Sequence, residues 1–136
     1  MTNTLDDVMA SFHRCRKDQA FIDTFYDLFL NKSPEIADKF RNTDFNIQRL
    51  MLRESLLVML CFNLGVTGTR EELVRMGRRH SRSQLDIRPE LYDLWLDALC
   101  ETIKLCDSEY SPGLEAAWRR EMQAGINIFL EEYDQH

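Results

Sequence analysis

All three prolines of this 136-residue chain stand at the start of an apolar segment with helical spacing. The clearest is Ser33-Pro34-Glu35, which combines an N-cap serine, a proline in the first turn and an acid near the positive end of the helix dipole. Arg88-Pro89-Glu90 and Ser111-Pro112 repeat the pattern. A helix tolerates proline without disruption only in its first turn, so these three sites predict where helices begin.

The remaining pattern predicts an all-α fold. Leu occurs 18 times against 11 for Val and Ile together, and Gly and Pro account for 8 of 136 residues, which favours helices over strands. Capping boxes at Thr4–Asp7 and Thr69–Glu72, and an N-cap at Asp18, predict further helix starts. We therefore expect six main helices and one short helix in a single domain over residues 1–136. The predicted segments are residues 4–17, a helix from Asp18 on, 33–40, 45–63, 69–80, and helices following Pro89 and Pro112.

Charge and hydropathy exclude two partner classes. The net charge of −6 and a pI near 5.1 do not suit a phosphate-binding surface, so we expect no nucleic acid partner. The longest apolar run, residues 56–62, is far shorter than the roughly 20 residues of a membrane span. The acidic N-terminus is unlike a secretory or mitochondrial leader. We expect a cytoplasmic protein.

The four cysteines form no metal-binding or disulfide pattern. Their intervals of 46, 39 and 6 residues match no zinc motif, so we interpret them as small apolar residues in a reducing compartment. The alternative is redox sensing by an exposed Cys15 or Cys106.

Three histidines are candidate metal ligands. His13 lies beside Arg14 and Arg16 on a polar side of its predicted helix and is expected at the surface, and His136, the terminal residue, is expected to be disordered. His80 closes the segment 69–80, in which Leu73, Val74 and Met76 are apolar. A single histidine on a helix is more often a surface or core residue than a ligand, so these residues alone leave its role open.

From about Phe12 to Tyr133 the chain resembles the globin family, most closely bacterial single-domain globins and the haem domain of flavohaemoglobins. The resemblance rests on a series of motifs at near-family intervals: Phe25-Tyr26-x-x-Phe29, Pro34-Glu35, Phe40, Gln48–Leu52, His80, Ile87-x-Pro89-x-x-Tyr92 and the Trp118–Phe129 stripe. It implies a globin fold and one haem-binding domain.

The resemblance also implies a cofactor and its contacts. The cofactor would be haem b, iron protoporphyrin IX, with His80 as the iron ligand and Tyr26 and Gln48 as hydrogen-bond donors to bound O₂. The competing alignment places Leu50 rather than Gln48 at the distal position, and Tyr26 could instead direct its hydroxyl to the surface. The other implied haem contacts are Phe40, Leu52, Met76, Arg79, Ile87, Tyr92 and Met122.

The implied function is reversible binding of O₂, CO and NO, for O₂ handling or for NO detoxification with an external reductase. No flavin or nicotinamide segment is present, so no intrinsic turnover is expected. In flavohaemoglobin-like domains a tyrosine and a glutamate form a relay around the ligand histidine; Tyr92 matches the tyrosine, whereas Tyr133 occupies the glutamate position. The alternative function is a globin-type sensor or a non-haem signalling module.

Five arginines surround the segment that ends at His80: Arg70, Arg75, Arg78, Arg79 and Arg82. Three interpretations remain open. The cluster is a solvated face, or Arg79, Arg82 or Arg88 pairs with haem propionates, or the cluster docks an acidic reductase or signalling partner.

Overall fold

The computed structural model describes residues 3–135, which contain seven helices and no strand. Six are long and one, α3, has a single short span, as the sequence predicts. The helices are α1 (Thr4–Cys15), α2 (Phe21–Leu30), α3 (Pro34–Lys39), α4 (Phe45–Asn63), α5 (Thr69–Arg79), α6 (Glu90–Cys106) and α7 (Pro112–Tyr133).

At two of the three proline sites, a side chain caps the start of the helix. The Ser33 hydroxyl accepts a hydrogen bond from the Ile36 amide at 3.2 Å, and the Ser111 hydroxyl accepts one from the Leu114 amide at 3.0 Å. Each bond satisfies one backbone N–H that the helix leaves without a partner. At the third site Pro89 is itself the residue before α6, without a side-chain cap.

Three of the predicted caps are wrong. Asn3 caps α1, while the Thr4 hydroxyl donates to Glu121 at 2.6 Å. Asp18 accepts from the Ala20 amide in a turn before α2, so it does not cap that helix. Gly68, with φ of 89°, precedes α5 in place of a capping box. Glycine adopts this left-handed backbone conformation at little cost. The conformation turns the chain directly into α5.

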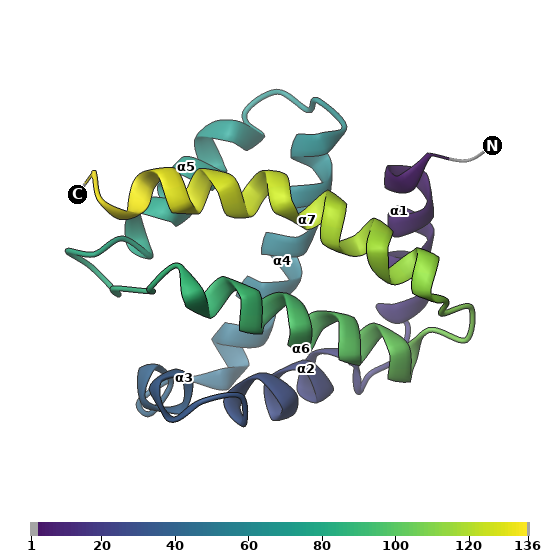
Figure 1. Ribbon diagram of the computed structural model, residues 1–136, viewed down its shortest axis with the longest axis horizontal. Helices are drawn as coiled ribbons and strands as arrows, with labels where there is room; N and C mark the ends of the chain where they lie inside the picture. Colours follow the sequence, from purple (N-terminus) through teal and green to yellow (C-terminus); the bar gives the residue numbers. More distant parts are fainter. Residues whose placement is uncertain (1–2, 136) are drawn as a thin grey trace.

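The helices pack around a core between α2, α6, α7 and the inner side of α4. Figure 1 shows α6 and α7 crossing in front of α4, with α1 and α2 completing the lower and right-hand parts of the view. Along α4, four residues face inward and are buried, as the spacing predicts: Leu52, Leu56, Met59 and Leu60. Trp118 of α7 is fully buried.

A buried polar network ties α1 to the loop between α6 and α7. The Asp107 carboxylate accepts from the Ser11 hydroxyl at 2.6 Å and from Arg14 at 2.8 and 3.0 Å. The Trp118 indole N–H donates to the Ser11 oxygen at 2.9 Å. Burial alone would raise the pKa of Asp107, but the bonds from Arg14 and Ser11 outweigh it and hold that pKa below its ordinary value.

All four cysteines are free thiols. Cys15 is fully buried, which raises its pKa to about 12, so the alternative of an exposed, redox-sensing Cys15 is wrong. Cys106 is half-buried, and burial raises its pKa to about 11. His13 is exposed as predicted, and His136 lies outside the described residues. Across residues 3–135, none of the helices combines the length and the apolar character that crossing a bilayer requires.

Candidate functional site

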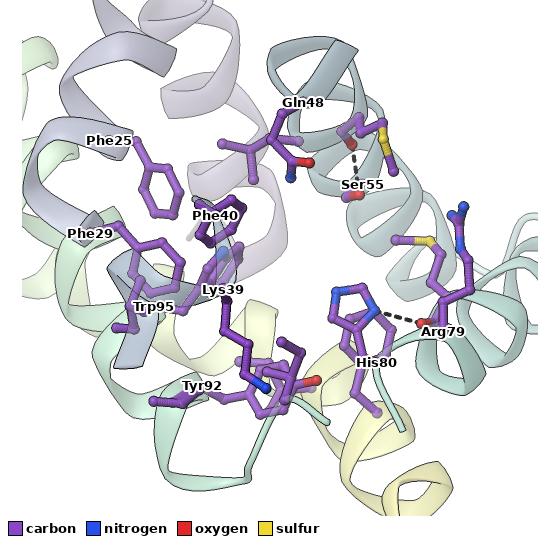
Figure 2. A pocket seen from close by; sticks show the side chains of 18 of the residues that line it. Phe25, Phe29, Lys39, Phe40, Gln48, Ser55, Arg79, His80, Tyr92 and Trp95 are labelled. Carbon is purple, nitrogen blue, oxygen red and sulfur yellow. Dashed lines mark hydrogen bonds between the residues drawn. The ribbon is translucent and has the colours of Figure 1, made fainter. Parts of the chain in front are cut away.

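A mainly apolar cavity opens among α2, α3, α4, α5, α6 and α7. It holds about 930 Å³ of space free of protein atoms, its opening to solvent included. Figure 2 shows this cavity with His80 on one side and Gln48 on another. Its lining is Phe25, Tyr26, Phe29, Ile36, Lys39, Phe40, Gln48, Met51, Leu52, Ser55, Met59, Met76, Arg79, His80, Ile87, Leu91, Tyr92, Trp95, Ile126 and Phe129.

His80 directs one ring nitrogen into this cavity. The residue follows the last turn of α5, and its Nδ1 makes a 2.6 Å hydrogen bond with the Met76 carbonyl oxygen. A carbonyl can only accept, so Nδ1 carries the proton and Nε2 keeps a free lone pair on the cavity side (Figure 2). Burial lowers the pKa of His80 below its ordinary value, which favours the neutral imidazole. This arrangement suits a metal ligand.

Packing and backbone bonds hold the His80 ring in place. The ring stacks on Phe129 of α7, with centroids 5.2 Å apart and planes 23° apart. The Tyr92 ring meets the same Phe129 edge-on at 5.9 Å. The His80 carbonyl accepts from the Ile87 amide at 3.0 Å, which fixes the following loop. The histidine is therefore restricted in both ring plane and position.

Tyr26 and Gln48 form a polar pair in the cavity wall. The Gln48 side-chain amide donates to the Tyr26 hydroxyl oxygen at 3.0 Å. The Tyr26 hydroxyl reaches the Gln48 backbone oxygen only at 3.4 Å. Burial raises the pKa of Tyr26 to about 12, so its proton is retained at neutral pH. Leu50 is well exposed and does not line the cavity, which places Gln48 rather than Leu50 at this position.

Aromatic rings from α2, α6 and the residue that ends α3 gather on one side of the cavity (Figure 2). Phe25 stacks on Phe29 at 5.3 Å and meets Trp95 edge-on at 5.9 Å. Phe40 meets both Tyr26 and Phe29 edge-on. Such offset and edge-on pairs are the favourable arrangements of aromatic rings, and they give the cavity a rigid apolar wall.

Two cations, Lys39 and Arg79, line the cavity and are exposed to solvent. Lys39 donates to the Leu85 carbonyl at 2.9 Å, and neither cation forms an ion pair within the described residues. The other two arginines considered as propionate partners are engaged elsewhere. Arg88 pairs with Glu35 through two nitrogens, one at 2.9 Å, and Arg82 pairs with Asp134 at 2.6 Å.

Tyr133 makes a contact that the flavohaemoglobin-like relay does not imply. This tyrosine, which the resemblance aligns with the relay glutamate, donates its hydroxyl to the Asp86 carboxylate in the loop after His80. Asp86 has a left-handed backbone, with φ of 52°. The Tyr133–Asp86 bond therefore anchors the loop between His80 and α6 to the end of α7, while His80 itself bonds to a neutral carbonyl.

Most residues that the sequence singles out meet at this cavity. The lining includes Tyr26, Phe40, Gln48, Leu52, Met76, Arg79, His80, Ile87 and Tyr92. Met122 is the exception, because it is fully buried in the core and Ile126, one turn further along α7, lines the cavity. Sequence reasoning missed Lys39 and Phe129. The available signals were their positions: Lys39 lies directly before Phe40, and Phe129 lies one turn before Tyr133.

One solved structure matches the chain over nearly its whole length. It is a Pseudomonas aeruginosa PAO1 protein whose crystal structure is described as structurally highly homologous to a human hemoglobin. The two are 40% identical, with a TM-score of 0.92 over 96% of this chain and 98% of the other. Neither the scan against protein-family models nor the search of curated proteins found a match. Fold, cavity and similarity agree, and the chain belongs to the globin family.

Proposed function

We propose that this globin binds haem in the cavity, with His80 as the iron ligand, and that it binds O₂ reversibly beside Tyr26 and Gln48. The observation that carries the proposal is the His80 ring, whose Nδ1 is bonded to Met76 while Nε2 faces a large apolar cavity. Haem b would supply an iron centre with four ring nitrogens, leaving one position for a protein imidazole and one for a diatomic ligand.

The donor set of the cavity fits this group. Its aromatic and aliphatic lining suits a flat apolar macrocycle, and Phe40, Leu52, Ile87 and Phe129 would hold its faces. Lys39 and Arg79, which are exposed and form no ion pair within residues 3–135, would bind the two propionates. Since Arg82 and Arg88 already pair with carboxylates, they would contribute less to propionate binding.

The neutral partner of His80 supports reversible binding over oxidative chemistry. A carboxylate on Nδ1 would make the imidazole more electron-donating, whereas the Met76 carbonyl carries no net charge. Across the cavity, Tyr26 would donate a hydrogen bond to a ligand with partial negative charge, and Gln48 would orient the tyrosine. CO and NO would bind at the same position, and NO consumption would need an external reductase.

The test is an absorption spectrum of the protein expressed with adequate haem, recorded as purified, after dithionite and after CO. We expect a Soret band that shifts on CO addition. His80→Ala should lose or strongly alter this band, whereas His13→Ala, which changes an exposed histidine of α1, should not. Failure to bind added hemin would refute the proposal and favour a non-haem signalling module. An unchanged spectrum in His80→Ala would refute the ligand assignment.

A further inference from the structure

Helix α7 passes α4 at Gly125, whose missing side chain leaves room for Met59. A Cβ on Gly125 would lie 2.8 Å from the Met59 Cε atom and 3.0 Å from the Met59 Cγ atom. Nonbonded carbon atoms prefer separations of about 3.5–4.0 Å, so no larger residue fits while Met59 keeps this position. Gly125 is itself buried in the core.

Glycine is an unfavourable residue at this place in the helix. It has the lowest helix propensity of any residue except proline, and Gly125 lies well inside the 22-residue helix α7. A Cβ on Gly113, near the start of the same helix, would meet the Ser111 hydroxyl oxygen at 3.8 Å, which is an ordinary contact. The absence of a side chain at Gly125 is therefore explained by its neighbour Met59 and not by the helix.

Met59 belongs to the inner part of the cavity. Met59 and Ile126 both line the cavity and are each 3% exposed, whereas Lys39 and Arg79, which also line it, are exposed and mark its opening. The cavity is thus the open space beside the Met59 thioether. Because methionine is flexible about three bonds, a methyl group added at Gly125 would move the end of Met59 into this space. The inner part of the cavity would become smaller.

The two edges of haem b differ in chemistry. The two propionates lie on one edge, and the two vinyl groups point toward the opposite side of the ring. Lys39 and Arg79, the proposed propionate partners, are at the opening of the cavity. The vinyl groups would therefore point inward, toward Met59 and Ile126.

We propose that Gly125 determines which haem the protein accepts, because it keeps the Met59 side chain clear of the vinyl groups. The inference rests on the proposed haem site. Gly125 does not itself line the cavity, so it acts through Met59 as a positioning residue. A haem with two vinyl groups needs the space that Gly125 provides. Deuterohaem, which carries hydrogen atoms in place of the vinyl groups, does not need it.

The first experiment compares hemin and deuterohemin, each reconstituted into the full haem-free chain. The loaded protein is mixed with excess apomyoglobin, and the rate of haem transfer is followed by absorption. Gly125→Ala should lose hemin at least about tenfold faster than the wild type, and deuterohemin less than about threefold faster. Gly113→Ala, the matched control on the same helix, should leave both rates unchanged.

Two further measurements separate this role from a general loss of packing. The free energy of unfolding of haem-free Gly125→Ala should equal or exceed the wild-type value, because alanine favours the helix and the end of Met59 moves aside. In a Met59→Ala background, Gly125→Ala should change the rate of hemin loss by less than about threefold, because the Met59 Cβ would lie 3.6 Å from the added methyl group. Circular dichroism confirms that each variant is folded.

Several results would overturn the inference. Gly125→Ala could leave hemin loss unchanged, accelerate the loss of hemin and deuterohemin equally, or lower the free energy of unfolding. Its effect on hemin loss could also persist in full in the Met59→Ala background. A wild-type chain that takes up neither hemin nor deuterohemin would refute the proposed haem site itself, and the inference with it.

Discussion

Replacing Tyr26 by phenylalanine removes one hydroxyl from the cavity and leaves the ring in place. In the structure this hydroxyl oxygen accepts from Gln48 at 3.0 Å. The hydroxyl oxygen lies 3.4 Å from the Gln48 backbone oxygen, beyond the 2.5–3.0 Å that separates the two oxygens in a well-formed hydroxyl hydrogen bond. The proton is therefore available to O₂ bound in the cavity, and Tyr26→Phe deletes that donor.

The expected size of the effect follows from this geometry. A hydrogen bond to a charged acceptor contributes about 1.5–3 kcal/mol, so O₂ should dissociate about 10- to 150-fold faster from Tyr26→Phe at 25 °C. Bound CO carries little charge, and its dissociation should change by less than about threefold. Since burial raises the pKa of Tyr26 to about 12, the wild-type O₂ rate should show no titration of this group at neutral pH.

The assay is stopped-flow displacement of O₂ by excess CO, with CO dissociation measured by replacement with NO. Tyr110→Phe is the matched control, because Tyr110 bonds to Glu115 outside the cavity lining. The reasoning fails if Tyr26→Phe keeps the wild-type O₂ rate within twofold. It also fails if the O₂ and CO rates rise by the same factor, since that result indicates a change in space rather than a lost donor.

Two further predictions concern stability and can be checked by chemical denaturation followed by circular dichroism. Asp107→Asn should lower the free energy of unfolding by about 2 kcal/mol, because Arg14 and Ser11 lose a buried carboxylate. The folded-state pKa of Asp107 is below its ordinary value. The loss of stability in Asp107→Asn should therefore be full above about pH 4 and should shrink as the pH falls through the folded-state pKa. A loss of stability that does not change with pH would contradict the role assigned to the Asp107 carboxylate. Gly77→Leu should lower the free energy of unfolding by about 1–3 kcal/mol, since even a Cβ there would lie 3.2 Å from Glu132 side-chain atoms. Gly77→Ala should leave the free energy of unfolding nearly unchanged. Equal effects of the two substitutions would contradict close packing of α5 on α7.

The sequence predicted helix starts best where the signal was a proline with its neighbours. Ser33 and Ser111 cap their helices because the hydroxyl and the amide that it binds are three residues apart, and no other element is needed. Thr4 shows the limit of this reasoning. Its hydroxyl is taken by Glu121, which is 117 residues away in the sequence, and the cap passes to Asn3.

The sequence also singled out nine of the residues that line the cavity, but it did not decide which residue of each helix faces the cavity. Whether α7 presents Met122 or Ile126 to the cavity depends on the rotation of that helix against α5 and α6, which no local pattern sets. Likewise, the sequence alone left both Arg79 and Arg88 as candidate partners of the haem propionates. The fold brings Glu35 to Arg88 and leaves Arg79 at the cavity.

By itself, then, the sequence determined the helical class, the approximate helix bounds and the identity of His80, Tyr26 and Gln48 as the polar groups of interest. The helical class and the helix bounds depend on hydrogen bonds and spacings within a few residues of the chain, whereas the three polar residues were identified by the resemblance to the globin family. Only the tertiary structure decided that Nε2 of His80 faces the cavity, that Lys39 lies at the cavity, and that Cys15 is buried. Those outcomes require helices far apart in sequence to pack at particular rotations, because burial and the approach of charges are properties of the assembled core.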